Sequence, residues 1–211
     1  MLILYHCADA RSFRCLWALE ELGLPYELKL LPFPPRWQQP DYLAENPLGT
    51  IPLLVDGATR MTESSAIIQY LATRHGPTPL SVAPDDRAYG AWLNWLHHGE
   101  ATLTFPQTIV LRYSRLEREE RRLPQAAADY ARWFDVRLAE GLGRALADGR
   151  DWLVADRFTA ADISVGYALQ LASVLKLDAS FSPEIAAYWG RCKTRPAFAR
   201  AKTAQKTELN L

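Results

Sequence analysis

The sequence predicts two domains of different class, an α/β domain at the N-terminus and an all-helical domain after it. In the first 76 residues, short apolar runs alternate with a helical pattern, as expected of a strand–helix–strand unit. Two further short runs around a tight turn then lead into another helix. Beyond a proline-rich linker at residues 77–84, no segment has the pattern of a strand, so residues 85–211 are predicted to be helical.

The composition of the 211 residues argues against several classes of protein. The 24 Lys and Arg residues balance 24 Asp and Glu residues, whereas binding to nucleic acid or to an anionic membrane surface needs a basic excess. No stretch reaches the ~18 apolar residues of a membrane span, and the start lacks the basic region of a signal peptide. The three cysteines are widely spaced, which favours a reducing, cytoplasmic location, and no metal-ligand spacing is present.

The first predicted unit is a strand, a helix and a second strand. The run Ile3–Tyr5 is typical of a short strand. From Ser12 to Leu22 the apolar residues recur at a helical period, and Gly23 ends the helix as glycine often does. Residues 26–31 predict the second strand. Because a helix joins the two strands, a right-handed crossover should make them parallel.

A turn rich in proline and glycine at residues 46–52 is the most informative stretch of the chain. It follows a predicted loop at residues 32–39 and a predicted short helix at residues 41–45. Pro52 opens an apolar run, and proline is tolerated at the first residue of a strand because it has no N–H. The Ile51–Pro52 bond can be cis at a cost of only ~0.5–1 kcal/mol. A cis bond would turn the N–H and C=O of Ile51 outward, where they can pair with another peptide backbone.

A hairpin and a helix follow this turn. Asp56-Gly57 is a hairpin signal, and a helix is predicted from Ser64 to Arg74. A helix start that carries a hydroxyl binds a carboxylate through its spare N–H groups and its dipole. The carboxylate of Glu63 beside it can bind an ammonium group. A ligand that carries a carboxylate and an amine on one carbon therefore fits Glu63 and Ser64.

Helix caps and prolines predict the elements of the helical domain. One long helix should run from Asp85-Asp86 to about Tyr113, with a kink or break at Pro106. Thr159 and Asp162 have the spacing of a capping box, and the mostly apolar helix that they open should be the core of this domain. We therefore expect these two residues to serve folding and not catalysis. The other helices should start at Pro124, Pro183 and Pro196.

The Ile51-Pro52 and Glu63-Ser64 pairs, in this order and at this spacing, resemble the glutathione-binding half of the cytosolic glutathione transferases. The segment from residue 11 to residue 27 is similar to a bacterial and fungal subgroup with the pattern Arg-Ser-x-Arg-Val-Leu-Trp-Leu-Leu-Glu-Glu. Residues 94–100 resemble the start of the helical domain in the same subgroup. The resemblance covers nearly the whole chain.

The resemblance implies a thioredoxin-like domain at residues 1–76, a linker at 77–84 and an all-α domain at 85–211 that lines the electrophile site. It implies glutathione as co-substrate and a homodimer. Ile51 would pair with the cysteinyl backbone, and the γ-glutamyl end would be held by Glu63 and Ser64. The proposed glutathione contacts are Thr50, Ile51, Pro52, Glu63 and Ser64. Many relatives carry Lys or Arg where Thr50 stands, so the partner of the glycyl carboxylate stays open, with Arg36, Trp37 and Gln39 as candidates.

Glutathione chemistry needs a thiolate, and a free cysteine-type thiol has a pKa of about 8.5. Lowering this pKa takes a hydrogen bond to sulfur, a nearby cation or a helix N-terminus, which points to the loop before the first helix. The resembled subgroup commonly has serine at the position of Ala10. The remaining candidates are Ser12, which is also placed to cap the helix; Tyr5, which is also placed for the core; and Arg11. A redox role for Cys7 is a minor alternative, because no Cys-x-x-Cys pair exists.

The second substrate is expected to contact the first long helix of the helical domain. The candidate residues are Trp95, His98, Phe105 and Tyr113, although an aromatic stripe is also typical of a core. His97 or His98 could protonate a leaving group near neutral pH.

The leading hypothesis is a cytoplasmic detoxification enzyme, a glutathione transferase that conjugates the glutathione thiol to electrophilic, mostly apolar small molecules. Two alternatives stay open. The same fold could catalyse glutathione-dependent peroxide reduction, isomerisation or reductive cleavage. It could also be a non-catalytic glutathione-fold binding protein, which Ala10 favours.

Overall fold

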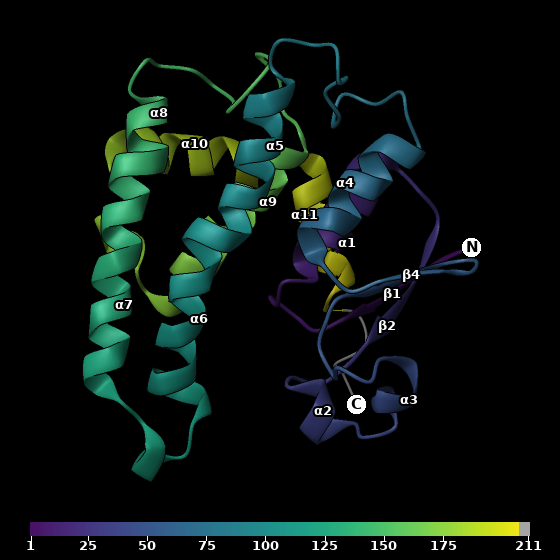
Figure 1. The fold of residues 1–211 in the computed structure, drawn as a ribbon, viewed down its shortest axis with the longest axis vertical. Helices are drawn as coiled ribbons and strands as arrows, with labels where there is room; N and C mark the ends of the chain where they lie inside the picture. Colours follow the sequence, from purple (N-terminus) through teal and green to yellow (C-terminus); the bar gives the residue numbers. More distant parts are fainter. Residues whose placement is uncertain (207–211) are drawn as a thin grey trace. The chain divides into compact units, whose positions relative to one another are not determined.

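The structure is a computed structural model that describes residues 1–206, and these residues form two compact units (Figure 1). The first unit contains residues 1–81 together with residues 193–206, and the second contains residues 82–192. The first is an α/β unit and the second is helical, which confirms the predicted fold class. The sequence placed all residues after 84 in the helical domain. Residues 193–206 instead group with the first unit, because the last helix packs on the first one.

A four-stranded mixed sheet forms the centre of the first unit, with the strand order β2-β1-β3-β4. The strands are β1 (Leu2–His6), β2 (Tyr26–Leu30), β3 (Leu53–Asp56) and β4 (Thr59–Met61). β1 is parallel to β2, with Leu2 opposite Tyr26, and antiparallel to β3, with Tyr5 opposite Leu53. β3 and β4 form the predicted hairpin, in which Gly57 has a φ of 58°. The four strands, their order along the chain and the parallel pairing of β1 with β2 agree with the prediction.

Five helices belong to the first unit. They are α1 (Phe13–Leu22), α2 (Pro35–Gln38), α3 (Tyr42–Glu45), α4 (Ser64–Arg74) and α11 (Pro196–Ala204). α1 is the crossover between β1 and β2, and all its residues from 13 to 19 are buried. The prediction of a loop at residues 32–39 was wrong for Pro35–Gln38, which form the short helix α2. Pro35 occupies the start of α2, where the fixed φ of proline favours a helical turn.

The second unit consists of α5 (Tyr89–His98), α6 (Phe105–Leu111), α7 (Pro124–Arg137), α8 (Arg144–Leu146), α9 (Ala160–Leu175) and α10 (Pro183–Lys193). π-helical turns at Gly99–Thr104 and Arg112–Leu116 extend α5 and α6, and one at Leu138–Gly143 joins α7 to α8. The long helix that was predicted to start at Asp85-Asp86 starts a few residues later, at Tyr89. The carboxylate of Asp86 accepts a hydrogen bond from the N–H of Ala88 at 2.8 Å in the turn that precedes α5.

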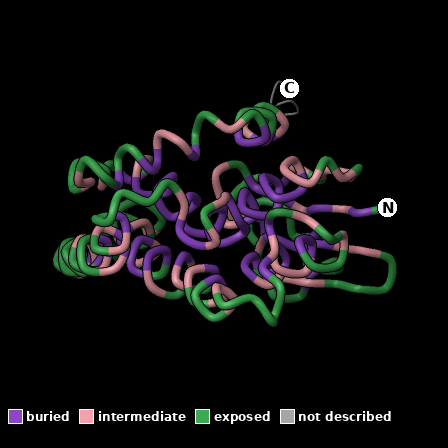
Figure 2. The backbone as a smooth tube through the Cα atoms, turned by 90° about the horizontal axis from the view of Figure 1, so that it is seen from above, coloured by how far each residue is buried: buried purple, intermediate pink, exposed green. Residues whose placement is uncertain are grey.

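The core of the second unit is α9, which is buried along most of its length. Figure 2 draws the buried residues of the chain in purple. The capping box is present: Thr159 accepts a hydrogen bond from the N–H of Ala161, and Asp162 accepts one from the N–H of Thr159 at 2.8 Å. Asp162 also accepts from the N–H of Leu153 at 3.1 Å and from the hydroxyl of Tyr188 at 3.0 Å. These contacts agree with a folding role for the capping box.

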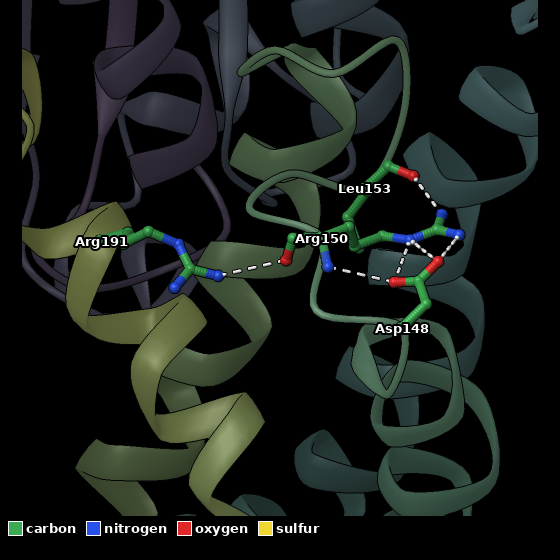
Figure 3. Close-up of polar contacts among 4 residues, drawn as sticks. All are labelled: Asp148, Arg150, Leu153 and Arg191. Carbon is green, nitrogen blue, oxygen red and sulfur yellow. Dashed lines mark hydrogen bonds and ion pairs between the residues drawn. The ribbon is translucent and has the colours of Figure 1, made fainter.

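The loop that leads to α9 is held by a network of arginines (Figure 3). The guanidinium of Arg150 forms two-pronged contacts with the carboxylate of Asp148 and donates to the C=O of Leu153 at 3.0 Å. Arg191, on α10, donates to the C=O of Arg150 at 3.4 Å. The network fixes the backbone that carries Leu153, whose N–H bonds to Asp162, so it supports the capping box.

Candidate functional site

The turn before β3 is held in one conformation by α2 and α3. The Ile51–Pro52 peptide bond is cis, as predicted. The C=O of Thr50 accepts hydrogen bonds from the hydroxyl of Tyr42 at 2.7 Å and from the amide of Asn46 at 2.8 Å. Gly49 has a φ of 60°, and a Cβ there would lie 2.6 Å from the Cβ of Arg36. Within residues 1–206, no hydrogen bond uses the N–H or C=O of Ile51.

The start of α4 brings the predicted Glu63 and Ser64 to one place. Glu63 is the N-cap residue, and its exposed side chain makes no capping hydrogen bond. Ser64 is buried, and its Oγ accepts a hydrogen bond from Nη1 of Arg14 at 3.2 Å. The neighbouring hydroxyl of Ser65 is buried without a partner among the described residues. Because the first N–H groups of a helix have no partner within the helix, this helix start can bind an anion.

Arg14 is a site residue that the sequence analysis did not identify. It lies on α1, its side chain is fully buried, and its guanidinium reaches the first turn of α4. The guanidinium keeps its positive charge, and the N-terminal end of a helix is the positive end of its dipole, so both favour an anion at this helix start. Since Arg14 donates to Ser64, the hydroxyl proton of Ser64 points to another acceptor. A charged residue within the apolar pattern of the first helix was the signal in the sequence.

The β1–α1 loop, residues 7–12, contains the predicted thiol-activating residues. Ser12 is fully buried, and its Oγ accepts from the N–H of Cys7 at 3.3 Å and donates to the C=O of Cys7 at 3.4 Å. Ser12 therefore makes no side-chain capping bond to α1, and its hydroxyl serves the loop itself. Burial raises the pKa of the Cys7 thiol to about 12, and its Sγ lies 3.6 Å from the C=O of Pro32, so its surroundings disfavour the reactive thiolate.

The other two catalytic candidates lie in different surroundings. Tyr5 packs against Tyr42, with ring centroids 5.4 Å apart, in a core cluster that includes Cys7 and Leu53. Burial raises the pKa of Tyr5, and the nearby carboxylate of Glu45 raises it further. Arg11 is partly exposed, close to the start of α1.

The structure does not bring the four predicted pocket residues into one cluster. The rings of Trp95 and His98 lie 4.8 Å apart on α5, and burial lowers the pKa of His98, with a smaller effect of the charge of Arg137. Phe105 instead packs edge-on against aromatic residues of α7, and Tyr113 lies under the guanidinium of Arg112. A shallow groove of about 400 Å³ follows α5 and includes only His98 of the four; its lining residues are Leu93, Asn94, His97, His98, Ala101 and Thr102.

The described part of the chain has neither a cluster of metal-ligating side chains nor a helix that could cross a membrane. No group of three His, Cys, Asp or Glu side chains that could hold a metal ion occurs within residues 1–206. In the same range, every helix is too short or too polar to cross a membrane. Cys7, Cys15 and Cys192 are buried, and none of the three forms a disulfide.

Comparisons with known proteins define the class of this fold and site. A family model described as the glutathione S-transferase N-terminal domain matches residues 10–74. Glutathione S-transferase GstA of Escherichia coli O157:H7 is 30% identical over 169 residues, which cover 78% of this chain and 78% of that protein. Glutathione S-transferase 3 of Schizosaccharomyces pombe is 35% identical over 103 residues, which cover 49% of this chain and only 43% of that protein.

Solved structures agree with the sequence comparisons. A sphingomonad glutathione S-transferase complexed with glutathione has a TM-score of 0.84 at 25% identity, covering 97% of this chain and 99% of that one. A glutathione transferase from Methylococcus capsulatus str. Bath has a TM-score of 0.83 at 27% identity, covering 98% of this chain and 99% of that one. The chain belongs to the glutathione S-transferase family.

Proposed function

We propose that this chain is a glutathione transferase that activates the glutathione thiol and conjugates it to electrophilic, mostly apolar small molecules. Ile51 pairs through its backbone with the cysteinyl residue of glutathione. Glu63 binds the γ-glutamyl ammonium group, and Ser64 with the start of α4 binds the γ-glutamyl carboxylate. Pro52 and Thr50 shape the turn that presents Ile51. Family membership and the glutathione bound in the sphingomonad relative support this assignment.

The observation that carries the proposal is the contact between Arg14 and Ser64. The guanidinium donates to Oγ of Ser64 at 3.2 Å, so Ser64 is left to donate its own proton to an anion. The buried positive charge behind that hydroxyl favours a ligand carboxylate in front of it. Glu63, exposed one residue earlier, supplies the opposite charge for an amine. An α-amino acid group, such as the γ-glutamyl end of glutathione, satisfies both.

We assign thiol activation to the start of α1 and to Arg11. The hydroxyl of Ser12 is bonded to the backbone of Cys7, the thiol of Cys7 is buried, and Tyr5 packs in the core. We therefore do not assign thiol activation to these three side chains. The positive end of α1 and the charge of Arg11 stabilise the thiolate that remains when the thiol loses its proton to water. The thiolate then forms a carbon–sulfur bond with the electrophile, and the leaving group departs with the electron pair of the broken bond.

The electrophile contact, the oligomeric state and the cellular role belong to the same proposal. The electrophile contacts Trp95 and His98, whose rings form one aromatic surface on α5. Phe105 packs against Tyr130 and Tyr113 lies beside the guanidinium of Arg112, so we assign the electrophile contact to Trp95 and His98 rather than to these two. The active form is a homodimer in the cytoplasm, where it serves detoxification.

A calorimetric titration with glutathione, followed by an assay with an aryl halide, tests the proposal. We expect saturable binding at one site per chain and release of halide that depends on glutathione. Absence of binding would overturn the proposal. Binding with oxidation of glutathione, or with its return unchanged, would instead identify a peroxidase, lyase or isomerase.

A non-catalytic binding protein is the second candidate. It is favoured by one observation: Ala10 carries no hydroxyl, and the hydroxyl of Ser12 is already bonded to Cys7. This candidate predicts glutathione binding without a lowered thiol pKa.

A further inference from the structure

The last helix of the first unit, α11, packs against α1, and the contacts along it follow α1 from its end back to its start. At the far end of α1, Arg195 forms a two-pronged ion pair with Glu21 at 2.6 and 2.7 Å. In the middle, Phe198 of α11 packs edge-on against Trp17, with ring centroids 5.0 Å apart. At the start of α1, Nζ of Lys202 lies 2.5 Å from the carboxylate of Asp9 in the β1–α1 loop. The helix therefore connects the end of α1 to the loop that precedes it.

Gln205 completes this contact at the loop. Its Oε1 accepts from the N–H of Asp9 at 3.2 Å, and its Nε2 donates to the carboxylate of Asp9 at 2.9 Å. A backbone N–H can only donate and a carboxylate can only accept, so the orientation of the Gln205 amide is fixed. His6 lies 3.2 Å from the same Oε1 and must therefore donate through Nε2. Gln205 is 3% exposed, so these bonds form away from water.

The residue that Gln205 contacts sets the course of the loop. Asp9 has a φ of 55°, in the left-handed region that few residues other than glycine adopt. A backbone conformation of this kind persists where several contacts from the surrounding structure hold it in place. Here Gln205 bonds both the N–H and the carboxylate of Asp9, and Lys202 pairs with that carboxylate. Directly after Asp9, Ala10 bonds to the C=O of Cys7 at 3.2 Å and the chain enters α1.

We propose that Gln205 is a positioning residue for thiol activation, acting through Asp9 on the β1–α1 loop. The inference rests on the proposed function. Because Ala10 provides no hydroxyl, activation depends on where the loop places Arg11 and the start of α1. Arg195, Phe198 and Arg200 bind α11 to α1 by themselves, so the Gln205 contact is not needed to dock the helix. The described bonds of the Gln205 side chain reach only Asp9 in the loop and His6 at the end of β1.

The test compares Gln205→Ala with Arg200→Ala. Arg200 lies on the same helix and bonds to Glu20 at 2.7 Å, so this control removes an α11–α1 contact without touching the loop. Hydrogen exchange of residues 8–12, the glutathione dissociation constant and the pKa of the bound thiol are measured for each variant. In Gln205→Ala we expect faster exchange in the loop and a thiol pKa raised by about one unit, which lowers the thiolate fraction by up to about tenfold at a pH below that pKa. We expect glutathione affinity to change less than about threefold, because Ile51, Glu63 and Ser64 are intact.

Each outcome decides the proposal. Unchanged exchange and an unchanged thiol pKa in Gln205→Ala would overturn it. An equal change in Arg200→Ala would also overturn it, because docking of the whole helix would then be the cause. If the native chain does not bind glutathione, the proposed function fails, and hydrogen exchange alone still decides whether Gln205 holds the loop. Should Gln205→Ala fail to fold, Gln205→Glu replaces it, since a carboxylate keeps the size but cannot donate to Asp9.

Discussion

The two halves of the proposed glutathione site are built in different ways. The half that binds the γ-glutamyl and cysteinyl groups comes from the turn before β3 and the start of α4, within residues 46–64. The half that activates the thiol, the β1–α1 loop, is bonded to Gln205, which is 196 positions away from Asp9 in that loop. The first half is determined by local turn and cap chemistry, with the contact from Arg14 to Ser64 as its long-range part. The second depends on a helix at the other end of the described chain.

The largest effect is expected in the first half. Glu63→Ala should weaken glutathione binding by about 10- to 100-fold, because a hydrogen bond to a charged group contributes roughly 1.5–3 kcal/mol. The thiol pKa of the remaining complex should not change, because the β1–α1 loop is untouched. Calorimetric titration with glutathione measures the affinity.

The matched control is Glu27→Ala, which removes an exposed carboxylate from β2. Its affinity should equal that of the native protein. Unchanged affinity in Glu63→Ala would disprove the assignment of this half of the site.

The second half should make stability depend on pH through His6. Burial lowers the pKa of His6 from 6.5 to about 4, with Lys202 adding a smaller lowering effect and Gln205, Asp9 and Ser12 opposing it. Between these two pKa values the unfolded chain binds more protons than the folded one, so stability is full above pH 6.5 and is lost as the pH falls toward 4. The loss should be on the order of 2 kcal/mol at about pH 4.5.

Comparing the native protein with His6→Gln separates the contribution of His6 to the pH dependence of stability from the contribution of buried acids. Burial raises the pKa of Asp162 to about 6, which acts in the opposite direction over an overlapping range. Urea unfolding of both proteins at about pH 7 and about pH 4.5 gives the difference. Equal losses of stability in the two proteins would show that His6 does not titrate as its burial requires.

A smaller effect is expected from the exposed part of the loop. Arg11→Met should raise the pKa of bound glutathione by about half a unit to one unit, because a nearby cation stabilises the thiolate. Glutathione affinity should stay within about threefold. Activity at neutral pH should fall by less than about tenfold.

Ser12→Ala and Tyr5→Phe are the matched hydroxyl controls for this prediction. Both should leave the thiol pKa unchanged, since one hydroxyl bonds to Cys7 and the other residue packs against Tyr42. A raised thiol pKa in either of them, with none in Arg11→Met, would move the activating role to that hydroxyl.

The sequence predicted the parts of the molecule that local chemistry determines. The cis Ile51–Pro52 bond, the hairpin at Gly57 and the capping box of α9 follow from proline, glycine and side-chain oxygens at fixed spacing. The predicted limits of α4 were correct to the residue. These features need no knowledge of the rest of the chain.

The parts that were missed depend on distant residues. Arg14 lies between apolar neighbours because α1 is covered on all sides, and its partner Ser64 is 50 positions away. The predicted cap at Ser12 was replaced by bonds to the backbone of Cys7. Residues 193–206 were assigned to the helical domain because a helix pattern does not reveal what the helix packs on. In each case tertiary contacts outweighed the local preference.

The most direct test of the account is the ultraviolet absorbance of the glutathione thiolate bound to the native protein, followed against pH. The account predicts that the bound thiol ionises well below its free value of about 8.5 for a cysteine-type thiol. Binding with an unshifted pKa would contradict activation by the β1–α1 loop and leave a glutathione-binding protein. No binding at all would contradict the assignment of Ile51, Glu63 and Ser64 as a glutathione site.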